Sequence, residues 1–256
     1  MGNTFEFSTK SKLFFIRFGF LFLLLTLWEV SARFWVDPMF LSPASKVLFA
    51  LPSLFAKPGL VKALGWLILE LMLAFAGSIL IGTVLGLMVG LRATSRKQFL
   101  PIVLLLYGTP QITILPIIML IAGVGFSSKV TFGITHGMFP VILTICSSLQ
   151  NINPIYLKTG LSLGASKWQT FKFILLPAIL PNFFNGVRLS LVASLLGVLL
   201  AELFASSNGI GFFTRQFTES FDPTALFGLI LIVVLISVSA NTWLTKVQQK
   251  MSRKRG

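Results

Sequence analysis

Long apolar stretches, separated by short segments that carry most of the charge, dominate this chain of 256 residues. Hydrophobic residues make up 55% of the chain and charged residues only 11%, whereas about a quarter of the residues in a typical soluble domain are charged. A helix needs about 20 apolar residues to cross the hydrocarbon layer, and backbone groups in lipid must be satisfied within the segment. The sequence therefore predicts an all-α integral membrane protein.

The apolar stretches are long enough for about six transmembrane helices. We place these spans at 13–33, 65–91, 99–123, 129–149, 179–205 and 224–245, within a single transmembrane domain covering residues 1–256. The segment 40–60 is too short and too rich in proline to span. We expect it to form a short amphipathic helix along the outer surface, beginning near Ser42 and Pro43, because proline suits the first helical turn.

The basic residues predict the orientation of the spans. They gather in the N-terminal segment, around 92–97, around 158–172 and at the C-terminus, and the formal net charge is +14. Because cytoplasmic loops carry an excess of Lys and Arg, both termini are expected in the cytoplasm, which requires an even number of spans. A cleaved signal peptide ending near Ala32 is the alternative for the first stretch, but Glu29 argues against it.

Several classes of function find no support in the residues. The chain has no G-x-x-x-x-G-K-[ST] loop, so we do not expect it to bind ATP in that way. One histidine and seven acidic residues, spread along the chain, offer no catalytic set, metal site or cofactor site. The excess of positive charge lies between membrane spans, so nucleic acid is not the expected partner. Cys146 stands alone, so no disulfide framework exists.

The second stretch has a small residue at every fourth position: Ser78, Gly82, Gly86 and Gly90. This spacing gives one smooth helix face, which lets a neighbouring backbone approach closely. The face serves either packing within the chain, which we favour, or an interface with another subunit or a pore.

Prolines interrupt the third stretch at 101, 110 and 116, and proline kinks a helix by removing a backbone hydrogen bond. Broken helices at membrane depth are tolerated where they line a cavity or are buried in protein. The kink thus serves either a translocation pathway or packing alone. The candidate pathway residues beside it are Tyr107, Thr109, Gln111 and Thr113.

Arg188 and Glu202 place charges in the fifth stretch and are also candidates for the pathway. An ionisable side chain at membrane depth costs about 2.5–3.5 kcal/mol, so it usually faces protein or water. Arg188 either helps to hold an anion or extends towards the headgroups. Glu202 either lines the outer mouth or, as we favour, accepts hydrogen bonds from the following loop, where Asn208 and Gly209 indicate a tight turn.

A polar, basic segment at 153–177 separates the fourth and fifth stretches. Asn153 and Pro154 form a good helix start, and Gly164 suits a helix stop. Ser166 with Gln169 reads as a capping box that opens a second helix, which we expect to end at about Leu176, before Pro177.

Apolar residues recur along this segment at roughly helical spacing, at Leu161, Ala165 and Trp168. We therefore expect two short helices that meet at a glycine bend and present an apolar face to a partner. The alternative is a helix pair that lies on the bilayer surface, which the lysines and Trp168 would also suit.

This segment resembles a known loop. Gly164, Ile174, Leu176 and Pro177 match the spacing of the EAA-x3-G-x9-I-x-L-P loop, which marks the membrane permease subunits of binding-protein-dependent ABC importers. The pieces L-G-A-S-K-W, L-L-P-A-I-L-P, G-V-R-L-S and A-E-L-F-A-S-S-N-G-I-G-F-F (201–213) are similar to the nitrate/sulfonate/taurine branch. The likeness runs from about Trp28 to the sixth stretch.

The resemblance implies a type I ABC importer permease-like fold, working as a homodimeric pore in a bacterial inner (plasma) membrane. The loop would act as a coupling helix that enters a cleft of a cytoplasmic ATPase subunit. ATP would bind there, so no cofactor is expected in this chain, and a periplasmic or lipid-tethered solute-binding protein would deliver the substrate. The implied coupling residues are Lys158, Thr159, Gly160, Gly164, Ala165, Ser166, Trp168, Ile174 and Pro177.

The resemblance favours a small anion such as nitrate, a sulfonate or taurine as substrate. A thiamine-precursor pyrimidine or another organic nutrient is the alternative. A stand-alone secondary transporter would have no use for a docking loop, and an intramembrane enzyme would need a nucleophile–base set that the chain lacks.

One departure from the family pattern lies at the start of the loop, where Lys158, Thr159 and Gly160 stand in place of Glu-Ala-Ala. The lysine reverses the sign of the charge and would repel a cation on the ATPase. Either the partner has an acidic or neutral residue opposite Lys158, or docking depends on Gly164, Ala165 and Trp168 and position 158 is free to vary.

Overall fold

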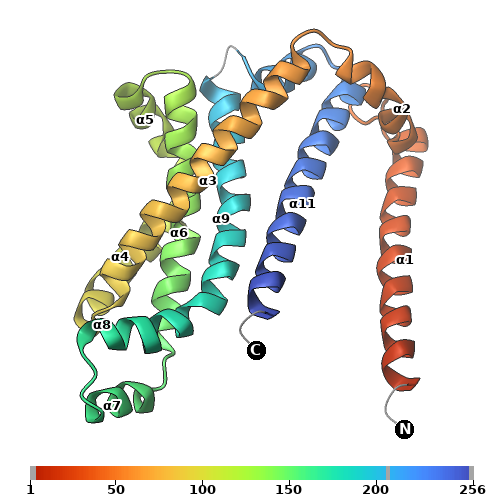
Figure 1. Cartoon of the computed structure of the whole chain (residues 1–256). Coiled ribbons are helices and arrows are strands. Elements are labelled where there is room, and N and C mark those ends of the chain that lie inside the picture. Colours follow the sequence, from red (N-terminus) through yellow and green to blue (C-terminus); the bar gives the residue numbers. More distant parts are fainter. Residues whose placement is uncertain (1–3, 206–207, 254–256) are drawn as a thin grey trace. The chain divides into compact units, whose positions relative to one another are not determined.

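The computed structural model describes residues 4–205 and 208–253, and every regular element among them is helical (Figure 1). Ser206 and Ser207 of the motif at 201–213, and Lys254 and Arg255 of the basic C-terminus, lie outside the described residues. The elements are α1 (Thr4–Phe34), α2 (Ala44–Phe55), α3 (Leu60–Gly90), α4 (Ala93–Gly108), η1 (Gln111–Ile114), α5 (Leu115–Ala122), α6 (Phe126–Gln150), α7 (Pro154–Ser162), α8 (Lys167–Thr170), η2 (Phe171–Leu175), α9 (Leu176–Ala205), α10 (Ile210–Glu219) and α11 (Pro223–Arg253).

The number of long apolar helices agrees with the predicted membrane topology. Five helices in the described ranges are long and apolar enough to cross a membrane, and a sixth span results if the bent pair of 93–108 and 111–122 is one crossing. The all-α membrane fold with about six spans is therefore confirmed.

The predicted span at 99–123 is not one helix. It is broken at Thr109 and Pro110, and its two halves are bent by 89°. Pro110 has no N–H with which to continue the α-helical ladder. The chain restarts as the 3₁₀ turn η1, in which the Thr113 N–H donates to the Pro110 carbonyl at 3.0 Å. The predicted kink is thus a full break.

By its internal contacts the chain divides into two compact units, Met1–Leu60 with Thr214–Val233, and Val61–Phe213 with Val234–Gly256. In the first unit, α2 begins directly after Pro43, as the sequence predicts. Glu29 of α1 accepts a hydrogen bond from the Ser45 N–H at 3.0 Å, and the hydroxyls of Ser42 and Thr224 lie 2.9 Å apart. These bonds tie the ends of α1, α2 and α11 together.

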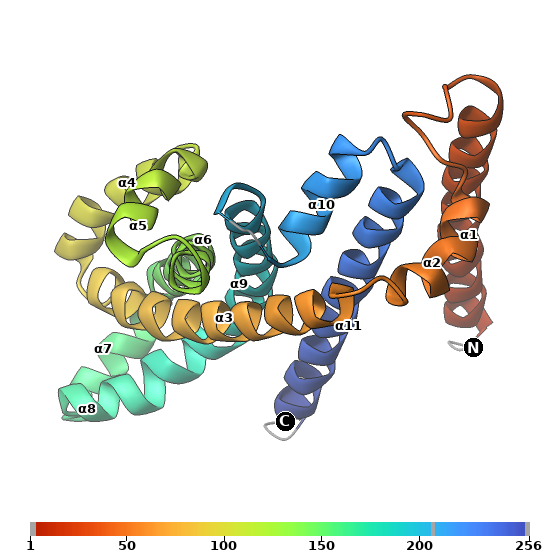
Figure 2. The same ribbon diagram turned by 90° about the horizontal axis from the view of Figure 1, so that it is seen from above.

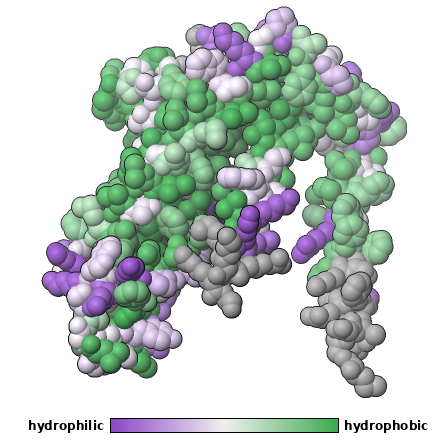
Figure 3. Space-filling model, in the orientation of Figure 1, coloured by the Kyte–Doolittle hydropathy of each residue, from purple (hydrophilic) through white to green (hydrophobic). Residues whose placement is uncertain are grey.

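The second unit is built around α6 and α9, which pack side by side, with α3 lying obliquely across them (Figures 1 and 2). Between α6 and α9 lies a core of Val141, Ile145, Leu149 and Ile179. In the space-filling view the flank over α3 and α4 is largely hydrophobic, while hydrophilic residues gather at the end where α7 and α8 lie (Figure 3). An apolar flank of this kind suits contact with lipid.

The small residues of α3 serve packing within the chain, the interpretation that the sequence favoured. A Cβ atom on Gly82 would lie 2.8 Å from the Met138 carbonyl oxygen, and one on Gly90 would lie 2.7 Å from a methyl of Leu149. Ser78 completes the row, with its hydroxyl oxygen 3.0 Å from that of Ser194 in α9. The row brings α3 into backbone contact with α6.

Gly82→Ala tests this contact. The added methyl has no room against the α6 backbone, and overpacking of this kind costs about 1–3 kcal/mol, so the melting temperature of the protein purified in detergent should fall. Gly65→Ala is the matched control, because a Cβ at this position of α3 has no neighbour within 4 Å. Equal melting temperatures for the two variants would mean that α3 is not held close to α6.

Candidate functional site

The segment that connects α6 to α9 begins with the predicted helix start. The Asn153 side chain accepts a hydrogen bond from the Ile155 N–H at 3.0 Å, and Pro154 occupies the first position of α7. Asparagine accepts a hydrogen bond from an otherwise unpaired N–H at the start of a helix. Proline costs no intrahelical hydrogen bond there, because the first N–H groups of a helix have no acceptor within it. The start of α7 is thus fixed by local chemistry.

Gly164 ends α7 as predicted, in the left-handed conformation with φ of +71°. The Ala165 N–H donates to the Gly160 carbonyl at 2.9 Å, and the Gly164 N–H donates to the Leu161 carbonyl at 3.0 Å. This pair of bonds is a Schellman motif, which satisfies the last carbonyls of the helix and turns the chain sharply.

The second helix opens with the predicted capping box. The Gln169 N–H donates to the Ser166 hydroxyl at 3.2 Å, and the Ser166 N–H donates to the Gln169 side-chain oxygen at 2.8 Å. Each polar group satisfies one otherwise orphaned backbone N–H.

The predicted end of this helix near Leu176 is wrong. The π-helical turn η2 follows α8 and leads into α9, so that Lys167–Phe204 is one uninterrupted helix. The helix changes direction instead of stopping, and α8 lies across the axis of α9 (Figures 1 and 2). Proline clashes with the carbonyl four residues earlier in a regular α-helix, and a π turn directly before Pro177 changes that spacing.

The loop exposes large apolar side chains. Leu161 is 71% exposed and Trp168 is 67% exposed, and the Trp168 ring stacks on Phe171 with 5.9 Å between centroids. Lys158, Thr159, Ser166 and Pro177 are exposed as well. Gly160, by contrast, is buried, and a Cβ there would lie 2.8 Å from a methyl of Ile174. The predicted coupling residues therefore share one bent element at a single end of the second unit.

The predicted pathway residues of the third stretch lie around the break between α4 and η1. Tyr107, Thr109 and Thr113 are exposed, and both threonine hydroxyls bond back to nearby carbonyls of their own segment. Gln111 is buried, and its side-chain oxygen has no hydrogen-bond partner.

The structure separates Arg188 and Glu202, the two charged pathway candidates. The Arg188 Nε donates to the Asn241 side chain in α11 at 3.3 Å. Glu202 lies fourteen residues further along α9, roughly 21 Å away at the rise of an α-helix. The two charges therefore do not form one site.

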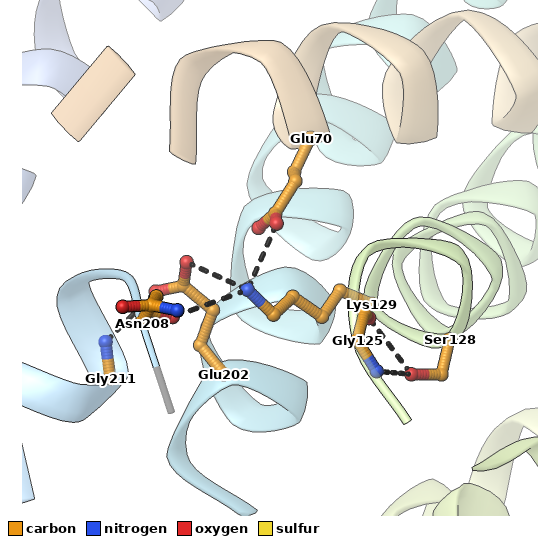
Figure 4. A network of polar contacts seen from close by, with 7 residues as sticks. All are labelled: Glu70, Gly125, Ser128, Lys129, Glu202, Asn208 and Gly211. Atoms are coloured by element: carbon orange, nitrogen blue, oxygen red, sulfur yellow. Dashed lines mark hydrogen bonds and ion pairs between the residues drawn. The ribbon is translucent and has the colours of Figure 1, made fainter. Parts of the chain in front are cut away.

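Glu202 belongs instead to a buried ionic cluster that joins α3, α6 and α9 (Figure 4). Lys129 of α6 lies between Glu70 of α3 and Glu202 of α9, with its Nζ 2.9 Å from a Glu70 oxygen and 3.6 Å from a Glu202 oxygen. Glu70 and Glu202 are 1% and 0% exposed. The other Glu202 oxygen accepts a bond from the Gly211 N–H at 2.9 Å. The hydrogen bond that the sequence favoured for Glu202 is thus present.

Sequence reasoning missed this cluster. Neither Glu70 nor Lys129 was among the predicted site residues. The available signal was one cation and two acids near the ends of three predicted spans, where a buried charge requires a counterion.

Comparison with known proteins agrees with this architecture. Residues 78–253 match the family described as binding-protein-dependent transport system inner membrane component. The taurine transport system permease protein TauC of Escherichia coli (strain K12) is 28% identical over 91% of this chain and 87% of its own length. The formylaminopyrimidine transport permease protein ThiX of Halalkalibacterium halodurans is 26% identical, with 90% and 91% covered.

Two further comparisons concern a sulfonate permease and the fold. The putative aliphatic sulfonates transport permease protein SsuC of Bacillus subtilis (strain 168) is 28% identical over 67% of this chain and 64% of its own length. A chain of the inward-facing MetNI methionine ABC transporter superposes with a TM-score of 0.66 at 14% identity, covering 75% of this chain and 95% of its own.

The fold and the loop define a membrane permease of the ABC importer class, with the type I fold. The chain belongs to the family of binding-protein-dependent transport system inner membrane components. Its place is therefore a bacterial inner membrane, and its role is transport in company with an ATPase and a solute-binding protein.

Lys129→Met tests the ionic cluster. Removing one partner of a buried ion pair costs about 3–5 kcal/mol, so the melting temperature in detergent should fall steeply. The triple variant Lys129→Met, Glu70→Gln, Glu202→Gln should recover most of the loss, because no buried charge remains. Lys62→Met, at an exposed position of α3, is the control. An unchanged melting temperature for Lys129→Met alone would show that the cluster contributes nothing to stability.

Proposed function

We propose that the loop at 153–177 is the element through which a cytoplasmic ATPase subunit drives this permease. The observation that carries the proposal is the hydrogen-bonded bend at Gly164, which presents exposed apolar side chains at one end of the second unit. Local caps hold both short helices in place, so the bend exists before any partner binds. An exposed apolar surface on a preformed element is typical of a docking site.

Several further features follow from this proposal. The loop end of the second unit faces the cytoplasm, and both termini lie on that side, in agreement with the distribution of Lys and Arg. ATP is bound and hydrolysed by the partner, and this chain contributes neither a cofactor site nor a catalytic residue. Two copies of the chain form the pore, and a periplasmic or lipid-tethered protein delivers the solute.

We also propose that the break between α4 and η1 lines the pathway, with Tyr107, Thr109, Gln111 and Thr113 beside it. The unpartnered, buried oxygen of Gln111 supports this assignment. Arg188, on the inner half of α9, is the candidate contact for an anion in transit. Glu202 pairs with Lys129 and accepts a hydrogen bond from Gly211, so we assign it a structural role at the outer end of α9.

We propose a small organic anion of the sulfonate or taurine kind as the substrate. The support is the likeness to TauC over nine-tenths of the chain and the further likeness to SsuC. The second candidate is a thiamine-precursor pyrimidine, favoured by the likeness to ThiX over a similar length.

Gly164→Val tests the docking function. A β-branched residue is a conformational outlier at positive φ, so we expect a cost of about 1–2 kcal/mol, which lowers the ratio of bent to unbent loop about five- to thirtyfold. ATP hydrolysis by the complex in proteoliposomes should fall accordingly, while the melting temperature of the permease changes little. Gly164→Asn should retain most activity, because asparagine tolerates this conformation. Full coupling in Gly164→Val would contradict the proposal.

The substrate is tested through the binding protein that works with this permease. We expect mass spectrometry of the solute that co-purifies with it to identify a sulfonate, and calorimetry to give taurine or an alkanesulfonate a clear advantage over a pyrimidine. A co-purifying pyrimidine would transfer the assignment to the second candidate.

A further inference from the structure

Helix α7 has two different faces. Gly160 and Leu157 turn towards the chain itself, since Gly160 is buried against Ile174 and Leu157 is half-buried. Ile155, Lys158 and Leu161 follow one another at intervals of three and share the opposite face. All three are exposed, and Ile155 and Leu161 are 63% and 71% exposed. The outer face is thus an ammonium group between two large apolar side chains.

Lys158 has no counterion nearby in the sequence. No Asp or Glu occurs between Glu70 and Glu202, so every charged residue in that stretch is a cation. Within residues 4–205 and 208–253, no ion pair involves Lys158. Its neighbours in the loop, Lys167 and Lys172, are exposed cations as well. Any surface that covers this face meets positive charge only.

The orientation of α7 favours a protein partner over the bilayer. A helix lying on the membrane turns its apolar face towards the lipid. Here the side towards the spans is occupied by the chain's own Ile174 in η2, and α7 lies beyond the arm formed by α8 (Figure 1). The face with Ile155 and Leu161 is the opposite one, directed away from the spans.

We infer that the partner surface that receives α7 carries a carboxylate opposite Lys158, set between apolar pockets for Ile155 and Leu161. The inference rests on the proposed docking of an ATPase subunit and adds the chemistry of its cleft. An ammonium that leaves water without a partner is strongly unfavourable, whereas a carboxylate pairs with it in a charge-assisted hydrogen bond. Charge complementarity of this kind also selects the cognate ATPase and rejects one with a basic cleft.

Zero-length crosslinking tests the pairing directly. A water-soluble carbodiimide couples an amine to a carboxylate in direct contact, so we expect it to join Lys158 to an Asp or Glu of the ATPase subunit that co-purifies with the tagged chain. Mass spectrometry of the joined peptides identifies that residue. Lys158→Arg should abolish the crosslink but keep coupled hydrolysis, because a guanidinium retains the charge and does not couple.

Charge reversal gives the functional arm of the test. Lys158→Glu should weaken the association with the ATPase at least about thirtyfold, since unpairing an interfacial charge has effects of this size. Changing the identified acid to lysine should restore it. Lys97→Glu is the matched control, with the same change of charge at an exposed position of α4 outside the loop, and should have a much smaller effect. Melting temperatures establish that both variants fold.

The outcomes separate this inference from the proposed function. If a photo-crosslinker at Ser166 captures the ATPase but carbodiimide gives no product at Lys158 and Lys158→Glu stays coupled, the acidic cleft is refuted and docking stands. If Ser166 never captures the ATPase, both fail. If Lys158→Glu instead reduces binding of the purified chain to phosphatidylglycerol vesicles but not to phosphatidylcholine vesicles, α7 contacts lipid and the inference is overturned.

Discussion

Backbone contact among α3, α6 and α9 is the constraint on which the second unit depends. Apolar side chains gain little by leaving lipid for one another, so helices in a membrane associate through close packing and polar contacts. Gly82 and Gly90 allow α3 to pack closely against α6. The paired hydroxyls of Ser78 and Ser194 form a polar contact between α3 and α9. The ionic cluster around Lys129 joins the same three helices near one end.

With those helices fixed, the two ends of the second unit differ in character. At the Lys129 end, buried charges pair within the chain, and Glu202 also anchors the start of α10 through the Gly211 N–H. At the other end, cations and apolar side chains are exposed around a bend that local hydrogen bonds define. Buried ion pairs thus mark one end of the second unit, and exposed cations and apolar side chains mark the other.

The features that the sequence predicts well are those determined by neighbouring residues. The Asn153 cap, the Gly164 bend and the Ser166–Gln169 capping box each depend on backbone groups within five residues, and each is present. The row of small residues on α3 also followed from spacing alone. The ionic cluster could not be derived in this way, because pairing Lys129 with Glu70 and Glu202 requires the packing of three distant helices. The helix end predicted before Pro177 was wrong for a related reason. A π turn accommodates this proline, and no pattern of neighbouring residues predicts that turn.

The uninterrupted helix from Lys167 to Phe204 has a mechanical consequence. Its short arm, α8, lies across the long arm, α9, and the helical backbone continues through the corner between them (Figure 1). In such an angled helix, a sideways displacement of the short arm tilts the long arm. Glu202 lies near the far end of that long arm, so one continuous helix connects the loop to the ionic cluster at the opposite end of the second unit.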